Sequence, residues 1–169
     1  MTEAKNLFEF QLRMYANLYF IIGVLETRLR IRIVITLSEF AELKNYSEWT
    51  EVVPNSFGNR RSLRKALKKN RNQIIGIENF LTFSFWRHLF DGANYTVLWI
   101  PSLHRVFPNL ENPLAFKSYA QVGNYLARAN QIRNRVAHFN FREAGEYELE
   151  KEVLFWLITR LGSEKLVKP

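Results

Sequence analysis

The feature that most constrains the fold is a long segment near the start of the chain, residues 5–43, that contains no proline. A brief alternation of arginine with aliphatic residues at positions 28–33 is typical of a strand, but the helical period on both sides outweighs it. We therefore expect one helix over residues 5–43. Its apolar positions are spaced by three, four or multiples of these, as one face of a helix requires: Tyr15, Leu18, Ile22, Leu25, Leu29, Ile33 and Phe40.

The rest of the chain shows shorter helical patterns separated by turn residues. Pro54 and Gly58 indicate a loop over residues 44–59, and an aromatic segment at residues 79–90 ends at Asp91-Gly92. Pro101 fits the first turn of a short helix, and two longer helices are expected at residues 116–138 and 147–161. Since no segment has a persuasive strand pattern, we predict an all-α fold with a single domain over residues 1–169.

Composition limits the classes of protein that this chain can belong to. Hydrophobic residues make up 47% of it and aromatic residues 15%, enough for a real core in one domain. The absence of cysteine excludes disulfides, thiolate zinc sites and cysteine nucleophiles. The first residues lack the pattern of a secretory signal, and the longest apolar run, residues 14–25, is too short to span a bilayer. We expect a cytoplasmic protein with no membrane segment and no cofactor.

The positive charge is concentrated in one short segment. The formal net charge is +8, from 24 basic and 16 acidic residues, and the segment from Arg60 to Arg71 holds +7 with no acid. Leu63 and Leu67 are four apart, so residues 60–70 can form a helix that packs on one side. Such a patch is typical of a phosphate-binding surface, and a solvated basic helix is the alternative. The candidate RNA contacts here are Arg60, Arg61, Arg64, Lys65, Lys68 and Lys69.

Three histidines limit the catalytic options. They do not stand at metal-ligand spacing, and the chain has no glycine-rich phosphate loop. His88 and His104 lie among aromatic and aliphatic residues, where a packed or surface role is expected. His138 differs because it ends an Arg-Asn-x-x-x-His run that begins at Arg133.

This run resembles the signature of HEPN-domain ribonucleases, and Arg-Asn-Arg-Val-Ala-His is similar to the version in bacterial Abi-like (abortive-infection) proteins. The resemblance implies a HEPN-like helical bundle with a long N-terminal helix and a C-terminal motif helix. One departure is Asn140, where HEPN partners of nucleotidyltransferase antitoxins have a tyrosine that is modified. Weaker matches follow the family's order from about residue 15 to 141: Leu25-Glu26, Leu29-Arg30, Ser56-Phe57-Gly58, Phe85-Trp86, Leu89-Phe90, Leu98-Trp99 and Phe107-Pro108.

The motif contains suitable groups for metal-independent RNA cleavage. His138 can accept or donate a proton near neutral pH, and Arg133 can hold a phosphate with two parallel donors. Asn134 can orient the imidazole or the phosphate, and Arg135 is a second candidate phosphate contact. These groups suit attack by the 2′-hydroxyl to give a 2′,3′-cyclic phosphate, which the resemblance also implies.

Helix geometry adds a constraint on this site. Asn134 and His138 share a face, but Arg133 and His138 are separated by about 140° around a regular helix. Either the helix is irregular there or two copies of the chain build the site, and the resemblance favours a homodimer. The alternative for Arg133 is an ion pair with an acid such as Glu26, and for His138 it is a helix C-cap.

The sequence thus predicts a metal-independent endoribonuclease of a bacterial abortive-infection or toxin-type defence system. Its expected partners are RNA and a second copy of the chain, with an antitoxin or regulatory protein as a further candidate. A non-catalytic RNA-binding or protein-interaction module with the same fold is the alternative.

Overall fold

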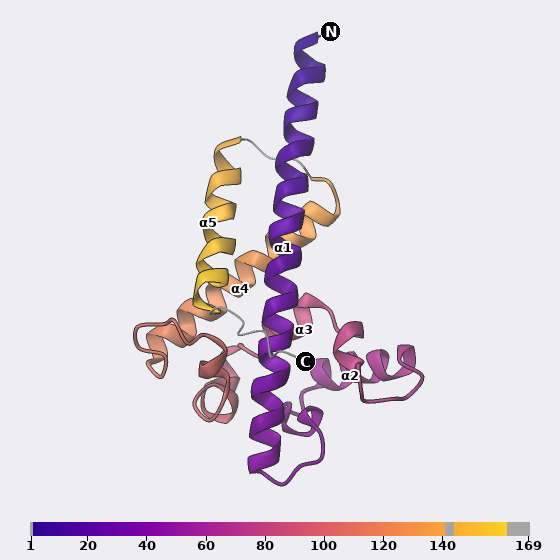
Figure 1. The fold of residues 1–169 in the computed structure, drawn as a ribbon, viewed down its shortest axis with the longest axis vertical. Coiled ribbons are helices and arrows are strands. Elements are labelled where there is room, and N and C mark those ends of the chain that lie inside the picture. The colour runs from indigo at the N-terminus through magenta and orange to yellow at the C-terminus, as the bar shows by residue number, and fades with distance from the viewer. Residues whose placement is uncertain (1, 141–143, 162–169) are drawn as a thin grey trace, which may run out of the picture.

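The computed structural model describes residues 2–140 and 144–161, and all regular structure in these ranges is helical (Figure 1). The predicted all-α class is therefore confirmed for this part of the chain. Residues 1, 141–143 and 162–169 of the expected domain lie outside it. In the described ranges, no helix combines the length and the apolar character that crossing a membrane requires.

Helix α1 (Thr2–Leu43) is the axis of the molecule and confirms the long helix predicted from the apolar period. One continuous stripe is buried on it. Helix α1 contacts elements from the rest of the chain, so a single core extends along most of it; these elements include η1 (Trp49–Val52), η5 (Leu103–Val106), α4 (Phe116–Ala137) and α5 (Ala144–Arg160). The first turns of α1 project past the other elements in Figure 1. The buried stripe comprises Leu18, Ile22, Leu25, Leu29, Ile33 and Leu37.

The middle of the chain folds into short helices beside the second half of α1. These are η1 (Trp49–Val52), α2 (Phe57–Lys69), η2 (Ile77–Phe80) and α3 (Phe83–His88). Helix α2 begins three residues before the predicted start because Ser56 Oγ accepts a hydrogen bond from the Asn59 amide and caps it. The Gly58-Asn59 pair, interpreted as a turn in the sequence, lies within the first helical turn. The aromatic segment at residues 79–90 is divided between η2 and α3.

An aromatic cluster connects this region to the second half of the molecule. The chain in this region forms three short helices: η3 (Gly92–Asn94), the π-helical turn η4 (Tyr95–Trp99) and η5 (Leu103–Val106). Phe90 packs edge-on against Trp99 and Phe107, with ring centroids 6.2 and 5.7 Å apart. Trp99 and Phe107 are fully buried, so this cluster fixes the chain that leads into α4.

Two helices complete the fold, α4 (Phe116–Ala137) and α5 (Ala144–Arg160). They pack against each other and against α1. Tyr125 stacks on Trp156 at 4.1 Å, and the Arg160 guanidinium lies 4.6 Å from the centre of the Trp156 ring. Helix α5 starts before the predicted residue 147, whereas α4 follows the predicted range to within one residue.

Candidate functional site

The Arg-Asn-x-x-x-His motif occupies the last turn of α4 and the residue that ends it. Helix α4 is held by a buried stripe that includes Val122, Leu126, Ala129, Ile132 and Val136. Because Ile132, just before the motif, and Val136, within it, pack into the core, the backbone of residues 133–138 is fixed. The side chains of Asn134 and His138 are exposed, and that of Arg133 is half-buried.

Helix α4 ends in a Schellman motif with His138 as the C-cap residue. The amide of Asn140 donates to the carbonyl of Arg135, and the amide of Phe139 donates to that of Val136, both at 3.2 Å. Phe139 has a φ of 50°, a left-handed conformation that is uncommon for a bulky residue. The helix is thus regular as far as Ala137, and the motif ends at a sharp and defined turn.

Arg133 and Asn134 lie together at this turn. Arg133 Nη1 is 3.4 Å from Asn134 Oδ1, at the long end of a hydrogen bond. Within the described ranges, Arg133 forms no ion pair with Glu26 or with any other carboxylate. His138 occupies the C-cap position of α4, which is the alternative role that the sequence predicted for it. Arg133 and His138 of one chain are not joined by a hydrogen bond, so the chain by itself leaves them as separate groups.

Arg135 is a correction to the sequence analysis. Its side chain is only 10% exposed and pairs with Glu150 of α5, whose side chain is 14% exposed. A guanidinium held in this way links α4 to α5 and is not open to a phosphate. Residue spacing carries no signal for this pair, because Glu150 lies on a separate helix.

An apolar groove of about 690 Å³ lies directly beside the motif, between the end of α4 and the first half of α1. Tyr15 Oη donates to the carbonyl of Asn140 and joins the two helices at this point. Tyr19 and Phe139 are both more than half exposed at its edge. The groove is lined by Leu12, Tyr15, Ala16, Tyr19, Val136, Ala137 and Phe139.

The basic segment forms most of α2. Each of its six predicted RNA contacts is exposed: Arg60, Arg61, Arg64, Lys65, Lys68 and Lys69. Ala66 is buried, and Leu63 and Leu67 pack against the core, so the helix buries one side as predicted. Figure 1 shows α2 beside the second half of α1, away from the groove at the end of α4. The two candidate regions are therefore separate surfaces.

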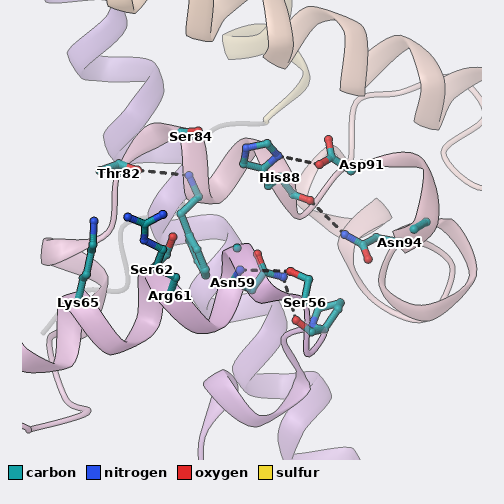
Figure 2. A pocket seen from close by; sticks show the side chains of 14 residues that line it. Ser56, Asn59, Arg61, Ser62, Lys65, Thr82, Ser84, His88, Asp91 and Asn94 are labelled. Atoms are coloured by element: carbon teal, nitrogen blue, oxygen red, sulfur yellow. Dashed lines mark hydrogen bonds and ion pairs between the residues drawn. The ribbon is translucent and has the colours of Figure 1, made fainter.

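The remaining histidines occupy different environments. His104 is half-buried, with Nδ1 2.9 Å from the carbonyl of Trp99, which agrees with a packed role. His88 is exposed and lines a polar cleft between α2 and α3, where its Nδ1 lies 2.7 Å from Asp91 Oδ2 (Figure 2). This pair was not among the site residues predicted from the sequence. Its signal was the three-residue spacing of a histidine and an aspartate at the end of a helix.

Across residues 2–140 and 144–161, no three histidine or carboxylate side chains are close enough together to hold a metal ion. Comparison of the chain with protein-family models, with curated proteins and with solved structures found no match.

Proposed function

We propose that this protein is a metal-independent endoribonuclease with a HEPN-like helical bundle, acting in a bacterial abortive-infection or toxin-type defence system. The observation that carries the proposal is the end of α4, where Arg133, Asn134 and His138 lie within the last turn and the C-cap, with Asn134 and His138 exposed. An exposed basic helix on the same chain supports RNA as the substrate.

The proposed reaction is attack by the 2′-hydroxyl on the adjacent phosphodiester. His138 accepts the 2′-hydroxyl proton, the 2′-oxygen bonds to phosphorus, and the bond from phosphorus to the 5′-oxygen breaks. Arg133 neutralises the charge that develops on the non-bridging oxygens with two parallel donors. Asn134 orients the imidazole or the phosphate. The 5′-oxygen leaves with a proton from a second acid, and the products are a 2′,3′-cyclic phosphate and a 5′-hydroxyl.

We further propose that the active form is a homodimer. Arg133 and His138 lie on different sides of α4, and a second copy brought to this turn supplies both groups to one phosphate. Exposed apolar side chains on the first half of α1, next to the motif, support an interface there. They are Leu7, Phe10, Leu12, Tyr19 and Phe20, each at least 37% exposed.

Product analysis on an end-labelled RNA tests the function. We expect cleavage in EDTA to give 2′,3′-cyclic phosphate and 5′-hydroxyl ends. His138→Ala should lower the rate by about 100-fold to 10,000-fold, because it removes the proton acceptor. His104→Ala is the control for loss of a histidine, since His104 contacts Trp99 and not the motif. Full cleavage by folded His138→Ala would contradict the proposal.

The exposed cations of α2 favour one alternative, a non-catalytic RNA-binding module. The same experiment separates the two functions, since such a module binds the labelled RNA and leaves it intact. A protein-interaction subunit that uses α2 to bind an acidic partner, such as an antitoxin or regulator, would bind RNA only weakly at physiological salt.

A further inference from the structure

The cleft between α2 and α3 is a second polar site, distinct from the end of α4. Its volume is about 580 Å³, within the range of small-molecule sites. Figure 2 shows α2 forming one wall, with α3 and the turn after it forming the other. The polar residues that line it include Arg61, Lys65, Thr82, Ser84, His88 and Asp91.

Two cations form the α2 wall. Arg61 and Lys65 are four residues apart on one face of the helix, and their side chains rise from α2 toward α3 in Figure 2. Both residues also line a neighbouring hollow on the outside of α2 with Arg60, Arg64 and Lys68. The cleft and the outer hollow are therefore joined through Arg61 and Lys65 into one cationic surface.

The opposite wall holds a fixed histidine. His88 Nδ1 lies 2.7 Å from Asp91 Oδ2 and 2.9 Å from Arg87 Nη1, and it cannot donate to the first while accepting from the second. The carboxylate is the stronger partner, so the Nδ1 hydrogen points to Asp91. This leaves Nε2 as the nitrogen available to a ligand. Arg87 Nη2 lies 3.3 Å from Asp91 Oδ1 and offsets the charge that would otherwise repel an anion.

The turn that carries this histidine is itself held in place. Asn94 Nδ2 donates to the carbonyl of His88 at 3.1 Å, and Tyr119 Oη of α4 donates to the carbonyl of Asp91. Hydroxyl groups complete the cleft. Thr82 Oγ1 accepts from the Phe85 amide at 3.4 Å, so its hydrogen is free to donate, and Ser62 and Ser84 lie on the two walls. The donors of the cleft thus come from two directions.

We propose that this cleft binds a terminal phosphomonoester, and that its occupant is the phosphorylated end of an RNA chain. A phosphomonoester carries close to two negative charges and three free oxygens, which suits cations and hydroxyls converging from both walls better than a singly charged phosphodiester does. The rest of the strand would follow the outer hollow, where Arg60, Arg64 and Lys68 meet backbone phosphates. The identity of the occupant rests on the proposed RNA function, while the phosphate chemistry of the cleft does not.

Binding of short RNAs by the full-length His138→Ala protein tests this assignment, because cleavage is expected to be absent and binding is measured separately. The probes are one sequence with a 5′-phosphate, a 3′-phosphate or hydroxyl ends, and a longer hydroxyl-ended RNA of equal total charge. We expect one phosphorylated form to have a Kd about tenfold lower than both hydroxyl-ended RNAs. Arg61→Gln and, separately, Lys65→Gln should reduce that ratio toward one. Circular dichroism checks that each variant is folded.

Arg60→Gln is the matched control, since it removes one charge from the same helix but lines only the outer hollow. It should weaken all probes alike and keep the tenfold ratio.

Equal affinity for phosphorylated and charge-matched hydroxyl ends would overturn the proposal, and so would an equal loss of the ratio in Arg60→Gln. Binding of a free nucleoside monophosphate as tightly as the phosphorylated RNA would overturn the RNA end as occupant. RNA cleavage that survives His138→Ala would contradict the proposed function but leave this result intact.

Discussion

The end of α4 and the basic helix α2 are both rich in arginine, yet the fold uses them differently. In α4, neighbouring cations have different environments: Arg135 pairs with Glu150 in the interior, while Arg133 faces the exposed turn without a described carboxylate partner. In α2, every cation is exposed, and Ala66, Leu63 and Leu67 pack against the core. A surface that only attracts phosphate needs charge, whereas a site that performs chemistry needs fixed positions. Single substitutions should therefore have large, specific effects in α4 and small, additive effects at the α2 cations that lie outside the α2–α3 cleft.

The largest effect on stability should come from Arg135. Arg135→Ala removes the guanidinium that pairs with the largely buried Glu150 carboxylate and should lower the free energy of unfolding by about 3 kcal/mol. Arg133→Ala, two residues earlier, should change it by less than about 1 kcal/mol. Urea denaturation of both variants measures the difference. Equal losses would remove the distinction between a structural and a functional arginine in this turn.

The next effect is on catalysis and concerns the other arginine of the turn. Arg133→Lys keeps the positive charge but loses the planar pair of donors, so we expect cleavage to slow by about 100-fold at saturating RNA. Thermal denaturation should be unchanged, in contrast to the Arg135 variant. Cleavage near the wild-type rate would assign Arg133 to packing and would leave His138 without its proposed phosphate clamp.

A pH effect is expected at Tyr119, which lies in the first turn of α4 and holds the Asp91 turn beside the α2–α3 cleft. Burial, assisted by the negative charge of Asp91, raises the pKa of Tyr119 from 10.0 to about 12. The fold thus favours the neutral phenol, and this contribution is complete below pH 10 and lost as the pH rises toward 12. We expect the free energy of unfolding to fall across that interval, by less than the full shift implies because solvent screens part of the interaction.

The control for this effect is Tyr119→Phe, which has no phenol to titrate. Its unfolding free energy should fall less than that of the wild type between pH 10 and 12, although it starts lower because the Asp91 carbonyl loses a donor. Parallel pH profiles for the two proteins would show that Tyr119 does not link α4 to the cleft in this way.

The smallest effect per residue is expected in α2. Lys68 and Lys69 are exposed at its end, and changing both to Gln should weaken binding to every RNA sequence by a few-fold. The slope of log binding constant against log salt should become shallower by up to about 0.7 for each lysine that no longer neutralises a phosphate. Cleavage at saturating RNA should be unchanged. An unaltered salt slope would assign these lysines to solubility or to a protein partner.

The sequence by itself determined the elements whose signal is local. The apolar period of α1 extends over many turns, so no tertiary contact was needed to predict that helix. The basic helix was predicted from charge and the Leu63/Leu67 spacing, and its start was placed too late because a Ser56 cap outweighs the turn preference of Gly58-Asn59. The position of the Arg-Asn-x-x-x-His motif at the end of a helix was also predictable, because α4 has a clear apolar stripe.

Only the tertiary structure decided which polar side chains are available for function. Arg133 and Arg135 are equivalent in a sequence, and they differ because Glu150 is brought to one of them by the packing of α5 on α4. The α2–α3 cleft likewise exists because the aromatic core packs α2 together with α3 and the turn after it. Arg61 of α2 and His88 of α3 line this cleft although they are far apart in the chain. Helix formation depends on neighbours within a few residues, whereas burial and pairing of a charge depend on whichever distant element covers it.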